Sequence, residues 1–357
     1  MTLNDIENSG TVRENRLDIR SMLPGELEKL LADMGQPKFR AKQLFKWLQS
    51  GVSSYDEMTD IPKSLRAQLA ESCYIAKAEA ALRLESKLDE TKKYLFRMHD
   101  GEYVESVLMS YHHGYSICIS TQVGCKMGCV FCATGRSGFS RNLTASEMLA
   151  QITTAQRTEN IRISNVVLMG MGEPLDNYDN VLRFLELLSH PDGVCIGARH
   201  VSVSTCGLVD KIDRLIEIEP QFTLSVSLHA PNDRLRSEMM PVNNRWPVAE
   251  LIAACRRFTE ATGRRISFEY SLVAGKNDSV ECAAELAALL RGMLCHVNLI
   301  PVNPVEGTGC KHPDRQNVRR FQDELTRRGI NATVRRTLGE DINASCGQLR
   351  RHNSEND

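Results

Sequence analysis

Residues 124–132 read Gly-Cys-Lys-Met-Gly-Cys-Val-Phe-Cys, which places Cys125, Cys129 and Cys132 in a Cys-x3-Cys-x2-Cys spacing. Thiolates are ligands well suited to iron–sulfur clusters. Three thiolates so close together can hold three irons of one [4Fe–4S] cluster and leave the fourth iron open to a small molecule. The alternative is a zinc site, which would need a fourth thiolate or a histidine nearby. The spacing therefore favours a cluster with one open coordination position.

The open iron is a suitable site for S-adenosylmethionine (SAM), which can bind a metal through its amino and carboxylate groups. That arrangement brings the sulfonium next to the cluster. One electron from the cluster would then split SAM to a 5′-deoxyadenosyl radical.

The sequence after residue 115 alternates between strand-like and helix-like runs. Such alternation predicts a parallel sheet with right-handed crossovers, and about six units predict an α/β fold with a partial (β/α)6 barrel related to the TIM type. In that fold, active residues lie at the carboxyl ends of the strands. The predicted strands are 116–120, 165–169, 200–204, 222–228, 266–272, 295–300 and 333–335. The predicted helices are 144–158, 178–189, 207–217, 247–262, 279–291 and 315–328.

The barrel is preceded by two shorter units. Residues 1–20 are polar and are expected to be flexible, and 21–80 show helical spacing of apolar residues, which predicts a small helical domain. Residues 81–112 alternate like strands around Asp100-Gly101, which predicts a β-hairpin linker. The core with the barrel would span 113–340, and 341–357 would form a C-terminal segment.

Polar and small residues follow several predicted strands. Gly170-Met171-Gly172-Glu173-Pro174-Leu175 comes after the second strand, where Gly172 would let the backbone approach a ligand and Glu173 could accept the SAM ammonium. Ser204 ends the third strand, and Ser227-Leu228-His229 end the fourth. A single histidine is usually structural, but the position of His229 at a strand end favours a role in binding.

The composition narrows the class of protein. The 357 residues carry a net charge of −1 and 42% hydrophobic residues, which indicates a globular protein rather than a disordered or histone-like one. Apolar stretches fall short of the roughly 20 residues of a membrane span, and we expect a cytoplasmic protein with no membrane contact. Pairs such as Arg319-Arg320 are compatible with RNA binding but do not require it. Most of the 12 cysteines are expected to be core residues rather than disulfides.

Taken together, these motifs resemble the radical SAM RNA adenosine methyltransferases of the RlmN/Cfr family, in particular the dual-specificity enzymes for 23S rRNA and tRNA adenine carbon 2. The resemblance covers nearly the whole chain. It rests on stretches 39–48, 58–60, 122–125, 169–175, 225–232, 296–301 and 344–349.

The resemblance implies a role for individual residues. Cys125, Cys129 and Cys132 would be the ligands of one [4Fe–4S] cluster. Glu105 would be the acid/base carboxylate, Cys346 the cysteine that one SAM methylates first, and Cys118 its partner. The SAM contacts would be Gly172, Glu173, Ser204, Ser227, Leu228, His229 and Asn303.

The implied chemistry explains why these residues are needed. Carbon 2 of adenine has no lone pair with which to attack a sulfonium methyl group. The methyl group is therefore expected to pass first to Cys346, to lose a hydrogen atom to a radical made from a second SAM, and then to add to carbon 2. Proton removal by Glu105 and attack of Cys118 on the Cys346 sulfur would release the product and leave a disulfide. This scheme needs two SAM per turnover, an electron donor and a thiol reductant. The family implies 23S rRNA and tRNA as substrates, with residues 21–80 as a candidate RNA-binding domain. We expect a monomer.

Two alternatives stay open from the sequence. The related carbon-8 methyltransferases of the antibiotic-resistance branch share the cysteines, and Pro174 favours the carbon-2 branch. A non-catalytic iron–sulfur or zinc RNA-binding module is the alternative from another class. The chain also departs from the family at Cys206, where serine is expected, and at Asn343-Ala344-Ser345, where Asp-Ala-Ala is common.

Overall fold

A ten-stranded sheet forms the centre of the computed structural model, which describes residues 16–305, 307–344 and 347–349. Its strands are β3 (Ala78–Glu85), β4 (Lys92–Met98), β5 (Tyr103–Tyr111), β6 (Gly114–Cys118), β9 (Ile163–Leu168), β10 (Val201–Thr205), β11 (Thr223–Ser227), β12 (Ile266–Leu272), β13 (Cys295–Pro301) and β14 (Ala332–Val334). They lie in the order β14-β13-β12-β11-β10-β9-β6-β5-β4-β3. Strands β6 and β9 to β14 are parallel, as the alternation predicts.

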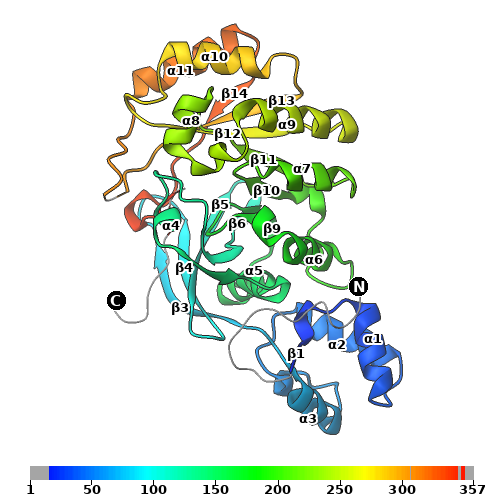
Figure 1. The fold of residues 1–357 in the computed structure, drawn as a ribbon. Coiled ribbons are helices and arrows are strands. Elements are labelled where there is room, and N and C mark those ends of the chain that lie inside the picture. Colours follow the sequence, from blue (N-terminus) through cyan, green and yellow to red (C-terminus); the bar gives the residue numbers. More distant parts are fainter. Residues whose placement is uncertain (1–15, 306, 345–346, 350–357) are drawn as a thin grey trace.

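The crossover helices follow one another along one side of this sheet (Figure 1). They are α5 (Ala145–Glu159), α6 (Tyr178–Ser189), α7 (Val209–Ile216), α9 (Val248–Thr262), α10 (Val280–Leu290) and α11 (Arg315–Arg327). The α/β partial barrel is thereby confirmed. A capping box starts α5, as predicted: the Thr144 side chain accepts from the Glu147 N–H, and the Glu147 carboxylate accepts from the Thr144 N–H.

The hairpin around Asp100-Gly101 is continuous with the barrel. Strands β4 and β5 flank this turn, and β3, which the sequence does not predict as a separate strand, pairs with β4. Because β5 also pairs with β6, the three strands extend the parallel sheet as an antiparallel wing. Residues on β5 can therefore take part in the barrel interior.

The N-terminal helices pack beside the barrel (Figure 1). They are α1 (Pro24–Asp33), α2 (Phe39–Gln49) and α3 (Lys63–Ser72), and the short strands β1 (Leu17–Asp18) and β2 (Cys73–Tyr74) pair at their base. The buried Arg20 donates to the Thr153 hydroxyl on α5 at 2.6 Å, and Arg183 on α6 pairs with Glu26 at 2.9 Å. Within the described residues, no helix is long and apolar enough to cross a bilayer.

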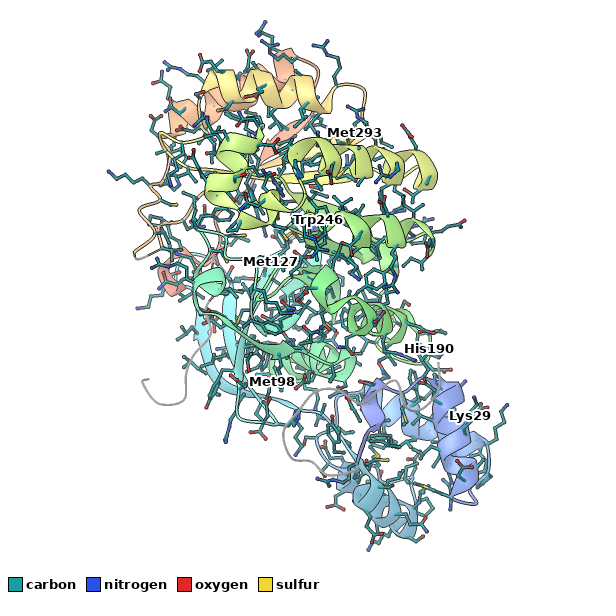
Figure 2. The ribbon with its side chains drawn as sticks, viewed as in Figure 1. Lys29, Met98, Met127, His190, Trp246 and Met293 are labelled. Atoms are coloured by element: carbon teal, nitrogen blue, oxygen red, sulfur yellow. The ribbon has the colours of Figure 1, made fainter. Side chains whose placement is uncertain are left out.

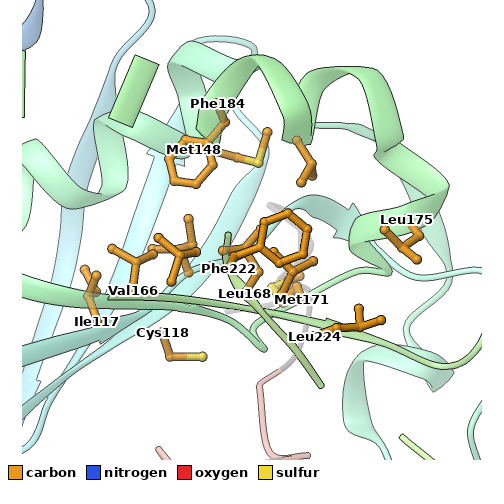
Figure 3. Packing of buried hydrophobic residues seen from close by; sticks show 14 of the residues in the cluster. Ile117, Cys118, Met148, Val166, Leu168, Met171, Leu175, Phe184, Phe222 and Leu224 are labelled. Carbon is orange, nitrogen blue, oxygen red and sulfur yellow. The ribbon is translucent and has the colours of Figure 1, made fainter. Parts of the chain in front are cut away.

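The sheet has two different faces. Ile117 packs with Met148 and Phe184 of the helical layer, whereas the next residue, Cys118, points to the opposite side of the sheet (Figure 3). Successive side chains of a strand alternate between its faces. Cys118 is consequently directed into the barrel interior and not into the layer between sheet and helices.

A buried guanidinium joins two strand ends. Arg236 lies on α8 (Asp233–Met239), a short helix that the sequence does not predict, and has no exposed surface. It donates to the carbonyl oxygens of Cys206 at 2.6 Å and Leu228 at 3.1 Å, and to the Asn243 side chain at 3.1 Å. These bonds connect the segments that follow β10 and β11.

Replacing this guanidinium should destabilise the fold. Arg236→Met removes donors from buried carbonyl groups, and we expect a loss of about 3 kcal/mol in the free energy of unfolding. Urea titration of the metal-free protein would measure it. Arg234→Met on the same helix is the matched control, because that side chain is 75% exposed and should leave the midpoint unchanged. Equal midpoints for both variants would contradict the structural role of Arg236.

Candidate active site

The cysteine loop begins with a close contact between two backbones. Strand β7 (Gln122–Gly124) pairs with β8 (Phe139–Asn142), and the loop with Cys125 lies between them. Gly124 has a φ of +79°, and a Cβ there would lie 1.9 Å from the Gly138 carbonyl oxygen. The Cys125 N–H donates to that same oxygen at 2.8 Å. Glycine at position 124 thus fixes the start of the loop.

The rest of the loop is held from two directions. The Cys132 N–H donates to the Cys129 carbonyl at 3.2 Å, and Cys132 then caps helix α4 (Ala133–Arg136). The Val130 N–H donates to the carbonyl of Met239, at the end of α8, at 3.0 Å. Met127, labelled in Figure 2, lies in this loop. The loop is therefore connected to the Arg236 helix.

The sulfur atoms of the loop suit a cationic partner. Burial raises the pKa of Cys125 to about 12 and raises that of Cys129 well above its usual range, and the neighbouring thiols add to both effects. Buried thiolates need a positively charged partner next to them. In the described parts of the chain, no three His, Cys, Asp or Glu side chains converge on one point. In a cubane cluster, each thiolate binds a different iron atom. Three thiolates that do not meet at one point therefore fit a [4Fe–4S] cluster.

The glycine-rich turn after β9 packs tightly against β6 and β7. A Cβ on Gly170 would lie 2.6 Å from the Ile119 carbonyl oxygen, and one on Gly172, whose φ is +103°, would lie 2.6 Å from the Gln122 Cβ. The Glu173 N–H donates to the Gln122 side chain at 2.8 Å. The turn thus brings Glu173 beside the cysteine loop.

Glu173 is a buried carboxylate with a fixed orientation. It accepts from the Leu175 N–H at 3.0 Å and from the Cys206 N–H at 2.7 Å. Burial raises its pKa, and these hydrogen bonds counteract that effect in part. A cationic ligand group such as an ammonium would compensate the buried charge.

The two serines and the leucine at the strand ends differ in how far their side chains are buried. Ser204 on β10 and Ser227 on β11 are half-buried, and by strand alternation both lie on the face of Ser225. Leu228 is fully buried, and its N–H and C=O already bond to Glu269 and Arg236. Contact of Leu228 with a ligand would therefore be apolar.

His229 is held in one tautomer. It adopts a left-handed φ of +58°, and its Nδ1 accepts from the Ser271 N–H at 2.9 Å, which leaves the proton on Nε2. Burial lowers its pKa to about 3, so the ring is neutral. The ring packs edge-on against Phe131 of the cysteine loop, with ring centroids 4.8 Å apart. His229 can therefore present an N–H donor beside the loop.

A cavity brings two more of the predicted site residues together. Cys118 and the buried Asn303 both line it, together with Ala344 and Leu349. Cys346 itself lies outside the described residues.

The predicted base lies on the neighbouring strand β5. Glu105 is buried, and its carboxylate lies 2.7 Å from the Lys93 ammonium. Sequence reasoning did not predict Lys93 or Arg236 as site residues. Single basic residues on a strand and on an unrecognised short helix carry no motif that would mark them.

Comparison with known proteins gives consistent matches along the chain. Residues 119–290 match the Radical SAM superfamily, and residues 17–75 match the Ribosomal RNA large subunit methyltransferase N-terminal domain. A protein of Alkaliphilus oremlandii named probable dual-specificity RNA methyltransferase RlmN is 50% identical over 341 residues, covering 96% of this chain and 99% of the relative. One of the same name from Lachnospira eligens is 51% identical over 334 residues, covering 93% and 95%.

A solved structure agrees with these relatives. The crystal structure of a radical SAM methyltransferase from Sphaerobacter thermophilus is 48% identical and superposes with a TM-score of 0.90. The match covers 94% of this chain and 99% of that one. The likeness therefore includes the N-terminal helices, the barrel and the segment after it.

Substitution of Gly124 should impair assembly of the cluster. Gly124→Ala forces a side chain onto the Gly138 carbonyl oxygen, and we expect at least a two-fold lower content of iron and sulfide after anaerobic reconstitution. Gly138→Ala is the matched control, because it has a similar φ of +75° but open space around its Cβ. If both variants assemble clusters equally, the close backbone contact is not what shapes the loop.

The neutral state of His229 should appear in the pH dependence of stability. The unfolded chain takes up a proton near pH 6.5 and the folded chain only near pH 3, so this residue makes stability fall as the pH drops below 6.5. His229→Gln should flatten that fall by up to about 1.4 kcal/mol per pH unit. Urea titrations of the metal-free protein between pH 8 and pH 4.5 test it. Identical slopes below pH 6.5 would refute the assignment, and above pH 7 the two profiles should be parallel.

Proposed function

Because the chain belongs to the family of dual-specificity radical SAM RNA methyltransferases named RlmN, we propose that it methylates carbon 2 of adenosine in RNA. The substrates are 23S rRNA in the peptidyl-transferase region and the adenosine next to the anticodon in tRNAs. Cys346 carries the methyl group as S-methylcysteine. The protein acts as a monomer in the cytoplasm, where both RNAs are found.

The contacts on either side of Cys346 carry this proposal. Ala344 and Leu349 line the same cavity as Cys118. Helix α4, directly after Cys132, donates from the Ala133 N–H to the Gly347 carbonyl at 2.8 Å and from the Thr134 hydroxyl to the Leu349 carbonyl at 2.5 Å. The residues on either side of Cys346 therefore line a cavity together with Cys118. They are also hydrogen-bonded to the helix that follows the cysteine loop.

The residues divide the reaction between them. The Cys346 thiolate first takes a methyl group from one SAM by displacement. Cys125, Cys129 and Cys132 would hold the cluster, which would supply an electron to cleave a second SAM. The resulting radical removes a hydrogen atom from the S-methyl group. Glu105 accepts the carbon 2 proton after the new carbon–carbon bond has formed. The adduct also loses one electron, which the cluster would take back. The Cys118 thiolate then attacks the Cys346 sulfur and breaks its bond to the methylene carbon, which takes up a proton and becomes the methyl group. An external thiol reductant reduces the resulting disulfide and restores both thiols.

The remaining site residues hold SAM. The Glu173 carboxylate receives the ammonium, and the Nε2–H of His229 donates a hydrogen bond. Gly172 allows close backbone approach, and Leu228 packs against the ligand. The other contacts come from Ser204, Ser227 and Asn303, and an external electron donor reduces the cluster.

The N-terminal helical domain provides the RNA-binding surface in this proposal. This domain comprises residues 21–80. The other parts of the chain are the hairpin of 81–112, the core of 113–340 and the C-terminal segment of 341–357. Chemistry on a base edge requires the target base to be unstacked, and we expect recognition of RNA shape around a splayed adenosine.

Loss of the carrier thiol should abolish methylation. Cys346→Ala cannot form S-methylcysteine, and we expect no 2-methyladenosine in 23S rRNA or tRNA of a deletion strain that expresses it, as measured by mass spectrometry of nucleosides. Cys118→Ala should leave RNA covalently attached to the protein, because no thiol attacks the Cys346 sulfur. Cys195→Ala, at an exposed cysteine, is the control and should methylate normally.

Three outcomes would contradict the proposal. Methylation at carbon 2 by Cys346→Ala would show that the carrier is elsewhere. Appearance of 8-methyladenosine in place of 2-methyladenosine would assign the chain to the carbon-8 activity. A reconstituted protein that binds RNA but does not cleave SAM would be a binding module.

A further inference from the structure

Lys93 forms a connection that the reaction scheme does not use. Its side chain, on β4, is only 11% exposed. Its Nζ lies 2.7 Å from a carboxylate oxygen of Glu105 and donates to the carbonyl oxygen of Asn343 at 3.2 Å. One buried ammonium therefore contacts both the proposed base and the backbone three positions before Cys346.

The turn that precedes Lys93 binds the same C-terminal segment. The Ser86 hydroxyl and the Lys87 N–H donate to the two carboxylate oxygens of Asp341 at 2.7 and 2.8 Å. In the reverse direction, the Gly339 N–H donates to the Asp89 carboxylate at 3.0 Å. The β3–β4 turn and residues 339–343 thus interlock through bonds donated from both sides.

The close fit leaves no room for a side chain at position 339. Gly339 has a φ of +61°, and a Cβ there would lie 2.9 Å from the Thr91 methyl group and 2.7 Å from the Ala344 Cβ. The segment consequently packs directly on the start of β4. Its position is set by the hairpin and not by the barrel strands alone.

We propose that Lys93 is a positioning residue that keeps the base Glu105 and the methyl-carrying segment in register. The inference rests on the proposed function, because it assumes the roles of Glu105 and Cys346. Burial of a carboxylate without a partner is costly, and the ammonium offsets this cost while orienting the acceptor oxygen. The bond to Asn343 fixes the distance between that oxygen and the backbone at position 343, which leads to Cys346. After proton transfer, the proton from carbon 2 is on Glu105 and Lys93 keeps its own charge.

The consequence is a coupling between radical formation and product formation. If the carrier segment and the base are out of register, SAM is still cleaved at the cysteine loop but the radical does not lead to product. Lys93→Met should therefore raise the ratio of 5′-deoxyadenosine to 2-methyladenosine at least ten-fold. The KM for RNA should change less than about three-fold, because Lys93 is buried and contacts Glu105 and Asn343 and not the N-terminal helices proposed to bind RNA.

The assay uses the full-length reconstituted protein with dithionite as electron donor. Dithiothreitol supplies hydrogen atoms to radicals that do not lead to product. Both nucleosides are quantified by mass spectrometry. Lys92→Met is the matched control, since Lys92 pairs with Glu159 at 2.7 Å and not with Glu105. It should give the wild-type ratio. Lys93→Arg, which keeps the charge and the donors, should restore coupling to within about three-fold of wild type.

Asp341→Ala provides a second test that leaves Lys93 and Glu105 in place. It removes the two bonds from the turn at an exposed side chain, and it should raise the ratio two-fold or more. If Lys93→Met does not accumulate as folded protein, the result for Asp341→Ala decides the test. A wild-type ratio for Lys93→Met, an equal rise for Lys92→Met, or, where Lys93→Met cannot be tested, a wild-type ratio for Asp341→Ala would overturn the inference. Absence of 2-methyladenosine from the wild-type reaction would instead refute the proposed function.

Discussion

The alternation of side chains along the strands is the constraint on which the site depends. One face of the sheet packs against the helices and is apolar, as Leu224, Phe268 and Tyr270 show. The other face carries Cys118, Ser225 and the residues that follow the strand ends. Since a shift of one residue would exchange the two faces, the packing of the helical layer also fixes which side chains line the barrel interior.

The polar interior contains buried charges, and each has partners that fix its orientation. Burial raises the pKa of Glu269, which accepts from Asn298 at 2.7 Å, while its backbone carbonyl accepts from His229. Burial lowers the pKa of Arg236, whose guanidinium is bonded to carbonyl groups at two strand ends. Oriented groups of this kind need no rearrangement when a charged ligand binds, which favours a preorganised site.

The antiparallel wing adds contacts to the barrel that the parallel strands do not make. It carries Glu105 on β5, and its outer turn holds residues 339–343, which precede Cys346 in the chain. The chain passes through the whole barrel between these two parts. A wing built from the first strands and a segment from the end of the chain therefore meet over the cavity that Cys118 lines.

The sequence by itself determined what depends on local spacing. The Cys-x3-Cys-x2-Cys spacing, the alternation of strands and helices, and the capping box at Thr144 act over a few residues or a few turns, and each can be read without knowing the fold. The family resemblance supplied Glu105, Cys118 and Cys346, but not how they are held. Only the tertiary structure decided that Cys118 faces the interior, that Arg236 bonds two strand ends, and that Lys93 reaches Asn343, 250 positions away in the chain. Such contacts arise from packing between distant segments, because side-chain direction and neighbours are set by the register of whole strands and not by the residues that carry the chemistry.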